Sequence, residues 1–390
     1  MISVEEARAA LLALVAPLEV EEIPLRAAAG RVLARDVAAA RTQPPFAASS
    51  MDGYALRRVE VEPDAMFKVV GEAAAGHRFE GTVGPGQAVR IFTGAPVPEG
   101  ADFVVIQEDV TRRGDLITLG HDIDGKDNIR PAGGDFTKGT PMRAPRRLRP
   151  ADIALLAAMN IARVPVTRRP VVAVLATGDE LVQPGEAPGP DQIVASNSYG
   201  LAAMLEGLGA EVRLLPIARD TEASLQQAFR LAQGADLLIT IGGASVGDHD
   251  LVGAVAEDAG LERSFYKVAM RPGKPLMAGH MGTMAMIGLP GNPVSAMVCG
   301  HVFVAPVIAR MLGLGDDAQP LATAPLGVDL PANGPRAHYM RARLDSGAIV
   351  PDARQDSSLL TVLASAEALL VRPVGDPARK AGEVVSYLPL

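Results

Sequence analysis

The feature that most constrains this sequence is a regular alternation of apolar runs and helical stretches after Pro170. The apolar runs cover 171–175, 212–217 and 237–241, and the helical stretches cover 199–208, 222–232 and 251–258. Strands and helices that alternate in this way form a parallel sheet with helices on both faces, and its buried strands are apolar throughout. We therefore expect a doubly wound α/β domain that binds ligands beyond the carboxyl ends of its strands.

The segments on either side of this domain have different patterns. Apolar positions at helical spacing over 4–15 and 25–34 predict a helical arm. Short alternating runs, punctuated by glycine and proline, predict a small β-rich module after residue 44 and a small β-barrel after residue 320. The expected fold class is multidomain α/β, with a helical arm and linker layer from 1–43 and 139–168, an inserted β-rich domain from 44–138, the α/β domain from 169–312 and a C-terminal β-barrel domain from 313–390.

Composition excludes several classes of protein. The formal net charge of -8, without a long Lys/Arg run, argues against a nucleic-acid partner, because phosphate backbones need a basic surface. The single cysteine, Cys299, excludes an intramolecular disulfide and a cysteine-based metal site, and a buried core thiol is the favoured interpretation. The start of the chain is acidic, unlike a signal peptide, and no uninterrupted stretch of about 18 apolar residues occurs. We expect a cytoplasmic protein that does not span a membrane.

Two glycine-rich turns open predicted helices, and the first of them follows a predicted strand. The first is the loop after the run at 237–241, and its residues of interest are Gly242, Gly243, Ser245 and Gly247. The second turn, at 288–295, opens the last predicted helix, from 292 to 312, and contains Ser295. Glycines let the backbone approach a ligand closely, and a helix N-terminus offers free N–H groups to an anion. The alternative interpretation is that the glycines serve packing alone.

A short basic loop contains a second kind of candidate residue. Arg271 and Lys274 lie three positions apart in a loop that also contains two prolines and a glycine. The prolines stiffen the backbone, so the two cations are held in a defined arrangement. A solvated surface loop is the alternative interpretation.

Carboxylates follow the predicted strands at the same edge of the sheet. Asp179 and Glu180 follow the first strand, Asp220 follows the second, and Asp248 and Asp250 follow the third. Oxygen ligands of this kind suit Mg²⁺ that bridges phosphates, so the metal set is Asp179, Glu180, Asp220 and Asp250. Each carboxylate could instead cap a helix, and Asp220 before Thr221 is a good N-cap candidate. The pattern favours a site for a phosphate-bearing ligand and a divalent ion.

Taken together, these motifs resemble the MoeA family of molybdopterin molybdenumtransferases, which is related to the E domain of gephyrin. The resemblance rests on the sequences at 177–181, 242–247, 272–275 and 289–295, and on the upstream sequences at 44–46, 50–55, 90–98 and 128–135. It covers the chain from about residue 3 to 390 in the expected order.

The resemblance implies an activity and an assembly. Molybdenum from molybdate is inserted into adenylylated molybdopterin with release of AMP and with the assistance of Mg²⁺. The implied assembly is an elongated homodimer, and the adenylyltransferase of the preceding step is a further expected partner. The active cleft takes Asp52 and Thr93 from the β-module of one subunit and the α/β domain from the other.

The resemblance also implies roles for the residues singled out above. Glu180, Asp220 and Asp250 belong to the pterin-nucleotide and metal site, where they form the catalytic set with Asp52 and Thr93, and Ser245 belongs to the phosphate loop. Molybdate lies near Arg271, Lys274, Ser295, Arg336 or Arg341, and Ser357. Arg271 stands where Lys is common in the family, so its planar guanidinium changes the geometry offered to an oxyanion.

Two other functions compete with this interpretation. The preceding adenylylation step uses the same kind of α/β domain, but it is normally carried by that domain alone, and the long flanking segments count against it. A scaffold without catalysis is the other alternative, and it has no need for Asp52, Glu180 and Asp250 together.

Overall fold

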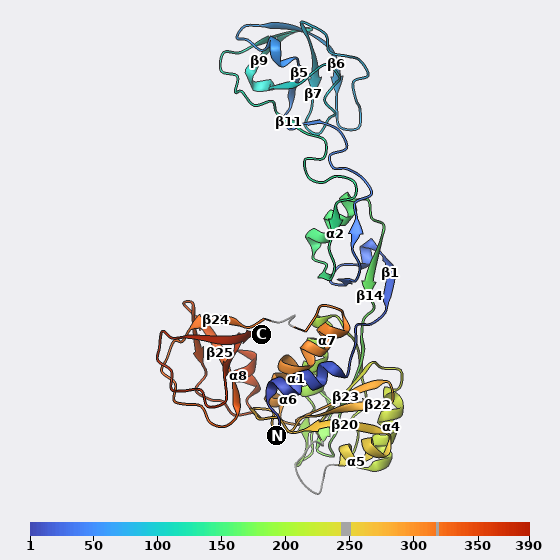
Figure 1. Cartoon of the computed structure of the whole chain (residues 1–390), viewed down its shortest axis with the longest axis vertical. Coiled ribbons are helices and arrows are strands. Elements are labelled where there is room, and N and C mark those ends of the chain that lie inside the picture. The colour runs from blue at the N-terminus through green and yellow to red at the C-terminus, as the bar shows by residue number, and fades with distance from the viewer. Residues whose placement is uncertain (243–250, 317–319) are drawn as a thin grey trace.

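The computed structural model describes residues 1–242, 251–316 and 320–390. The chain is elongated, with a β-rich module at one end, a small middle module, and a larger body that contains the α/β domain and the C-terminal domain (Figure 1). Both chain termini lie in the larger body (Figure 1). The chain therefore leaves this body, travels to the distal module and returns.

The α/β domain is a six-stranded sheet with the order β18-β15-β19-β23-β22-β20. Its parallel strands are β18 (Glu211–Leu214), β15 (Val171–Ala176), β19 (Leu237–Ile241) and β23 (Met284–Leu289). The antiparallel strands β22 (Met277–Met281) and β20 (Leu261–Tyr266) extend one edge. The predicted strands at 171–175 and 237–241 are confirmed, and the run at 212–217 forms a strand that begins one residue earlier and ends at Leu214.

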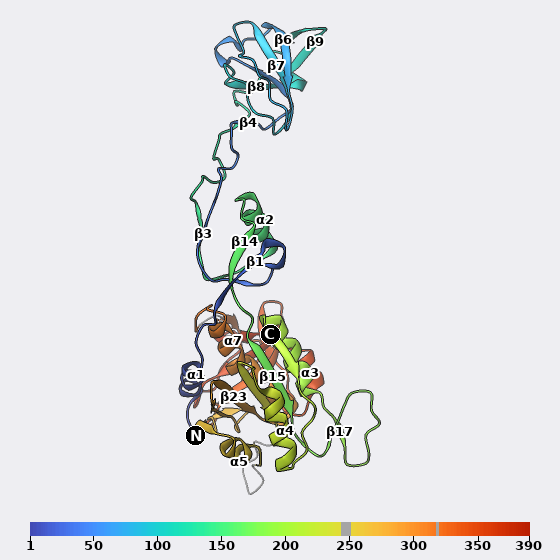
Figure 2. The same ribbon diagram turned by 90° about the vertical axis from the view of Figure 1, so that its right-hand side faces the viewer.

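Helices cover both faces of this sheet, as predicted (Figure 2). They are α3 (Asn197–Leu208), α4 (Glu222–Ala232) and α5 (Leu251–Asp258). Alternate residues of β15 enter different cores: Val172 and Val174 pack with α3, whereas Ala173 and Leu175 pack with α4 and α5. This two-sided burial is the reason that the strands are apolar without alternation.

The last helical segment begins at Pro293, after Asn292, as predicted. It consists of α6 (Pro293–Cys299), a π-helical turn (Gly300–Val304) and α7 (Ala305–Met311). Its length and composition would suit a membrane span, but 83% of its most apolar window is buried inside the protein. It is therefore the central core helix of the body. Cys299 is fully buried there, which confirms the core thiol, and burial raises the pKa of this thiol.

The helix α1 (Val4–Ala13) begins at the predicted capping box. Glu6 N–H donates to Ser3 Oγ at 3.0 Å, and Ser3 N–H donates to Glu6 Oε2 at 2.7 Å. This helix packs against α7, and its buried residues Val4, Ala7 and Leu11 join the core of the α/β domain. It therefore covers the α/β domain and does not extend into an arm.

The prediction of a helical arm is wrong for 25–34. That stretch forms only a 3-10 turn (Leu25–Ala27) and the strand β2 (Val32–Leu33). The middle module is a sheet with the order β1-β14-β2-β13, made of β1 (Val20–Pro24), β14 (Arg163–Thr167), β2 and β13 (Arg146–Arg147), and it packs with the helix α2 (Pro150–Ala158). Strand pairing with residues more than 100 positions away overrides the local helical spacing. The strands β3 (Val37–Ala38) and β12 (Pro141–Met142) pair in the connection to the distal module.

The distal module is β-rich, as predicted. Its main sheet has the order β8-β5-β7-β6-β10-β9. The strands are β5 (Gly53–Leu56), β6 (Met66–Ala73), β7 (Gln87–Ile91), β8 (Phe103–Ile106), β9 (Val110–Arg113) and β10 (Leu116–Leu119), and β4 (Ala48–Ser49) pairs with β11 (Ile129–Arg130) below them. Short turns also occur at Arg58–Glu60 and Gln107–Asp109.

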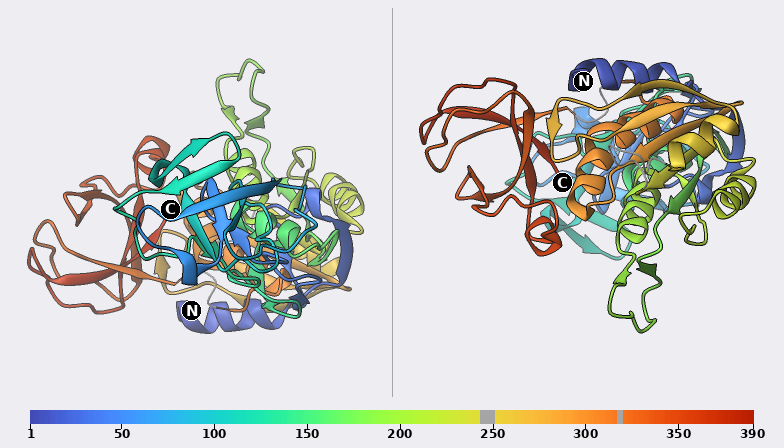
Figure 3. Two further views of the ribbon diagram at one scale, coloured as in Figure 1. Left: turned by 90° about the horizontal axis from the view of Figure 1, so that it is seen from above. Right: turned by 90° about the horizontal axis from the view of Figure 1, so that it is seen from below.

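The C-terminal domain contains β24 (Ala322–Pro325), β25 (Ala337–Asp345), β26 (Ala348–Pro351), the helix α8 (Leu360–Ala364), β27 (Ala368–Arg372) and β28 (Val384–Pro389). Leu326, just after β24, bridges Ile349 of β26, so the ends of the sheet meet as expected for a small barrel. The short strand β21 (Met270–Arg271) belongs to the α/β segment of the chain but pairs with β25. The C-terminal domain is therefore held beside the α/β domain by main-chain pairing (Figure 3).

Candidate functional site

A large cleft lies at the carboxyl ends of β15, β19 and β23, where the fold predicts a ligand site. Its volume is about 1170 Å³. Its walls include Thr177, Gly178, Glu180, Asp220 and Gly242, all of which follow strands. The strands β16 (Leu181–Val182) and β17 (Ile193–Val194) flank a loop that projects beside this end of the sheet (Figure 2). The structure thus brings the predicted strand-end residues together.

Two glycines let the strand ends pack this closely. Gly178 has φ +148°, and a Cβ at this position would lie 2.3 Å from Glu180 Oε2. Gly242 has φ +96°, and a Cβ there would lie 2.7 Å from the carbonyl oxygen of Thr177. Both positions require a backbone that side chains rarely allow, so these glycines shape the floor of the cleft.

The carboxylates of the cleft are accessible. Asp179, Glu180 and Asp220 are exposed, and Asp220 N–H donates to Asp179 Oδ1 at 3.2 Å. The N-cap of α4 is Thr221, whose hydroxyl accepts from Ser224 N–H at 3.3 Å. The alternative that Asp220 caps this helix is therefore wrong, and its carboxylate is available to a ligand.

Part of the predicted site lies outside the described residues. This applies to Gly243, Ser245, Gly247, Asp248 and Asp250. Among the residues that the structure does describe, no group of three acidic, histidine or cysteine side chains is arranged to hold a metal ion. Glu180 and Asp220 are the carboxylates that line the cleft.

A buried arginine without full hydrogen bonding contacts the segment that leads to Ser358 of this cleft. Arg341, on β25, is 0% exposed. Its Nη2 donates to the carbonyl oxygens of Asp356 at 2.9 Å and Arg354 at 3.4 Å. Its Nε and Nη1 have no hydrogen-bond partner in the described part of the chain. Burial lowers the pKa of Arg341, and a buried cation with free N–H groups is costly unless an anion completes it.

Several further arginines lie near His338, three positions before Arg341 on β25. His338 is buried next to β21, and its pKa is lowered to about 3 by burial and by the charges of Arg271, Arg341, Arg372 and Arg336. Arg372 is neutralised by a buried ion pair with Asp376. Arg271, Arg336 and Arg341 form no ion pair within 4.0 Å among the described residues. The charges of all three arginines predicted near the oxyanion thus reach His338.

The basic loop, the last helix and the C-terminal domain meet at the cleft. Val294 N–H, at the start of α6, donates to the carbonyl oxygen of Ser357 at 3.1 Å. Pro275 and Ser358 line the cleft, and they directly follow Lys274 and Ser357 in the chain. Ser295 is 3% exposed on the first turn of α6. Lys274, Ser295 and Ser357 therefore lie at the border between the cleft and the C-terminal domain.

Asp52 and Thr93 form a unit on the distal module. Asp52 Oδ1 accepts from the backbone N–H and from the hydroxyl of Thr93, both at 2.8 Å. These bonds, and the charge of Arg90, keep the pKa of Asp52 below its usual value. Arg90 stacks on the rings of Tyr54 and Phe92, 5.1 and 4.6 Å from their centroids. Figure 1 shows the distal module at the opposite end of the chain from the α/β domain, so one chain does not bring this pair to its own cleft.

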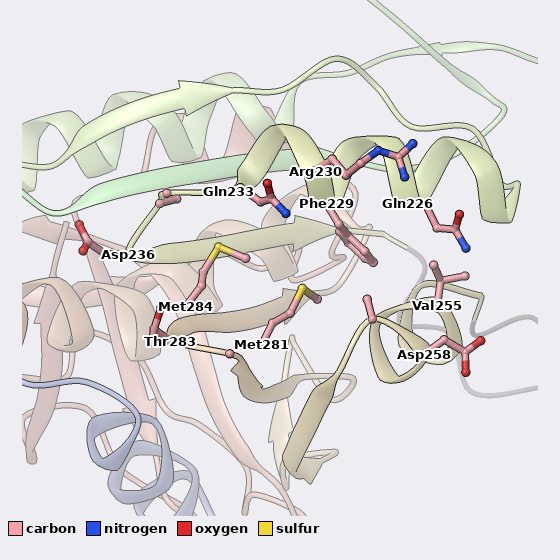
Figure 4. Close-up of a pocket in the computed structure, with 14 residues that line it drawn as sticks. Gln226, Phe229, Arg230, Gln233, Asp236, Val255, Asp258, Met281, Thr283 and Met284 are labelled. Atoms are coloured by element: carbon pink, nitrogen blue, oxygen red, sulfur yellow. The ribbon is translucent and has the colours of Figure 1, made fainter.

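A second pocket, of about 720 Å³, lies at the other end of the strands. Figure 4 shows that it is formed by α4, α5 and the turn between β22 and β23. Phe229, Met281 and Met284 supply apolar walls, and Arg230 donates to Gln227 at 2.7 Å. None of its lining residues belongs to the predicted site. Among the described residues that line it, Arg230 is the one cation, so the cleft is the better candidate for an anionic ligand.

Comparison with known families covers nearly the whole chain. The family described as "MoeA N-terminal region (domain I and II)" matches residues 2–160, and "MoeA C-terminal region (domain IV)" matches residues 323–390. Between them, "Probable molybdopterin binding domain" matches residues 173–310. The chain belongs to the MoeA family. Among curated MoeA relatives, the molybdopterin molybdenumtransferase of Haemophilus influenzae is 40% identical over 80% of this chain and 78% of its own.

Other relatives agree over longer stretches. The molybdopterin molybdenumtransferase of Nostoc sp. is 36% identical over 95% of this chain and 89% of its own. A crystal structure of the molybdopterin biosynthesis MoeA protein of Pyrococcus horikoshii OT3 matches with a TM-score of 0.84 and 28% identity, and it covers all of both chains. These matches confirm the predicted family and the multidomain α/β fold.

Two amide side chains of this MoeA chain contact predicted site arginines but were not predicted from the sequence. Gln355 is joined to the main chain of Arg341 at both ends of its amide: its Oε1 accepts from the N–H at 3.1 Å, and its Nε2 donates to the carbonyl at 3.0 Å. Asn333 accepts from Arg271 Nη2 at 3.3 Å. Asn333 precedes Gly334 and Pro335, a pattern that indicates only a turn, and no local signal connects either amide to an arginine.

Proposed function

We propose that this protein is a cytoplasmic molybdopterin molybdenumtransferase. It inserts molybdenum from molybdate into adenylylated molybdopterin and releases AMP, a late step of molybdenum cofactor biosynthesis. The curated relatives carry the name of this activity. The observation that carries the proposal is the fully buried Arg341, whose Nε and Nη1 lack partners in the described chain. Its Nη2 donates to Asp356, two residues before Ser358, which lines the strand-end cleft.

The two anionic reactants, the pterin nucleotide and molybdate, would bind in two different parts of the site. The cleft, with its close-packed glycines and its exposed carboxylates, suits the pterin nucleotide. Arg271, Arg336 and Arg341, with Lys274 and the hydroxyls of Ser295 and Ser357, suit the tetrahedral molybdate. Because both parts meet at Pro275 and Ser358, the oxyanion would lie next to the bound pterin. Holding two reactants together in this way lowers the entropic cost of their reaction.

Mg²⁺ fits the donors that the cleft offers. Mg²⁺ usually takes one or two carboxylates together with phosphate oxygens and waters, so Glu180 and Asp220 suffice from the described residues. Asp179 shares its carboxylate with the N–H of Asp220, and Asp250 remains a predicted ligand outside the described residues. When bound, the ion would neutralise phosphate charge and polarise the phosphate ester.

A homodimer is part of the proposal. Asp52 and Thr93 are far from the cleft of their own chain in Figure 1, whereas a second copy could present them to it. The site would then be complete only between two subunits. The adenylyltransferase of the preceding step would be the natural donor of the substrate.

The test is a turnover assay on the full chain. The protein is incubated with adenylylated molybdopterin, Mg²⁺ and molybdate, and AMP release is measured together with activation of an apo-molybdoenzyme. We expect molybdate-dependent AMP release and activation. The absence of AMP release would refute the proposal, and ATP consumption with unmodified molybdopterin would indicate the adenylylation step instead.

A further inference from the structure

The amide of Asn333 is held in one orientation by the C-terminal domain. Its Nδ2 donates to the carbonyl oxygens of Arg336 at 2.9 Å, Arg372 at 3.1 Å and Pro373 at 2.7 Å. Its own N–H donates to the carbonyl oxygen of Asp376 at 2.8 Å. An amide nitrogen with three carbonyl acceptors cannot exchange places with its oxygen, so Oδ1 must point the other way.

That oxygen faces Arg271. The guanidinium Nη2 of Arg271 donates to Asn333 Oδ1 at 3.3 Å. The backbone of Arg271 is held by the same domain, because β21 pairs with β25 and places Arg271 opposite His338. Ala337 N–H also donates to the carbonyl oxygen of Ala269 at 2.9 Å. Both ends of this long side chain are therefore tied to the C-terminal domain.

We propose that Asn333 is a positioning residue for oxyanion binding, and that it acts through Arg271. The inference rests on the proposed function, and it adds Asn333, which is not among the residues proposed above to contact the oxyanion. Arg271 is exposed, and a free arginine loses considerable rotamer entropy when it binds an anion. A guanidinium is planar, so fixing one N–H sets the directions of the others. Asn333 thereby orders Arg271 before the anion arrives.

Arginine suits this arrangement better than lysine would. An ammonium group that donates to Asn333 keeps two rotating donors with no fixed plane. A guanidinium that donates through one Nη2–H keeps several N–H groups in a rigid fork. Asn333 and Arg271 thus form a matched pair between two domains of the chain.

The experiment is a double-mutant cycle on the full-length protein, with molybdate alone as the probe. Binding is measured by calorimetry up to millimolar molybdate for the wild type, Asn333→Ala, Arg271→Ala and the double variant. We expect Asn333→Ala to weaken molybdate binding about 3- to 10-fold in the wild-type background, and by less than about 2-fold when Arg271 is absent. Lys274, Arg336 and Arg341 remain in both Arg271→Ala proteins, so molybdate binding stays measurable.

The cycle separates positioning from a general effect on the C-terminal domain. Asn333→Ala also removes bonds to three carbonyls, and a structural disturbance of that kind would weaken molybdate binding equally in both backgrounds. Equal weakening, or an unchanged affinity in the single variant, would overturn the inference. AMP binding in the cleft, measured in the same proteins, should be unchanged. Failure of the wild type to bind any molybdate would instead overturn the proposed oxyanion site itself.

Discussion

Replacing Arg341 with methionine should remove oxyanion binding without unfolding the protein. The change keeps an unbranched apolar stem but deletes the guanidinium of a residue that is 0% exposed, with its Nε and Nη1 unpartnered in the described chain. Each hydrogen bond from a charged group to an anion contributes about 1.5–3 kcal/mol. The loss of two such bonds is therefore worth about 3 kcal/mol or more, which corresponds to a factor of about 100 in molybdate affinity.

The same substitution should cost little stability. It removes two hydrogen bonds to carbonyl oxygens, but it also removes the desolvation cost of a buried cation that has no ion pair in the described structure. We expect the free energy of unfolding to change by less than about 1 kcal/mol. Calorimetric titration with molybdate and urea unfolding of the same sample measure the two effects.

Arg372→Met is the matched control on the neighbouring strand β27. Arg372 is equally buried, at 3% exposure, but it is paired with Asp376 and donates to two backbone carbonyls. Its loss leaves a buried carboxylate with less compensation, so it should destabilise the protein by about 3 kcal/mol. If Arg341→Met destabilises the protein as much as the control, or leaves molybdate affinity unchanged, the interpretation of Arg341 as an oxyanion donor is refuted.

Three further predictions test the shared site, the floor of the cleft and the stability of the fold. Asp52→Asn and Asp220→Asn should each abolish AMP release. If each site takes residues from two chains, a mixture of the two variants that has exchanged subunits should recover about a quarter of wild-type activity. No recovery after confirmed subunit exchange would argue against the shared site. Gly178→Ala should lower the free energy of unfolding by about 1–3 kcal/mol and reduce AMP release, because the new Cβ would meet the adjacent carboxylate at a positive φ, and unchanged urea unfolding would contradict the strain. Burial alone would raise the pKa of Asp236, but hydrogen bonds from Arg168 and from the Val171 N–H outweigh burial and lower this pKa. The ionised carboxylate therefore stabilises the fold above pH ~4, and this stabilisation is lost as the pH falls through the pKa of Asp236 in the folded protein. Asp236→Asn should accordingly be less stable than the wild type at pH 7, with a difference in urea unfolding that shrinks at acid pH; a constant difference would exclude this linkage.

Local sequence patterns predicted the elements whose character is set by their own residues. The apolar runs at 171–175 and 237–241 are strands, the stretch at 222–232 is a helix with those bounds, and the capping box at Ser3 begins α1. The same reasoning failed at 25–34, where pairing with distant strands overrides helical spacing. Local patterns cannot report such pairing, because its partners lie far away along the chain.

The candidate site also has features that local sequence patterns predicted and features that they could not show. Strand ends at one edge of a parallel sheet must converge, so Glu180, Asp220 and Gly242 were predictable from their positions after apolar runs. The sequence could also supply Arg271 and Lys274 as a stiff pair of cations. It could not show that Thr221 caps α4 and leaves Asp220 free, because both residues suit an N-cap.

The sequence by itself determined the alternating α/β core, the strand-end position of the cleft and the family, because these depend on local periodicity and on short motifs. Only the tertiary structure decided which cations are buried and which groups they contact. The pairing of β21 with β25 brings Arg271 to Asn333, 62 positions away, and Arg341 is buried against the segment 354–356 with its Nε and Nη1 unpartnered in the described chain. Burial and orientation are properties of packed neighbours, and long-range packing is not written in any short stretch of residues.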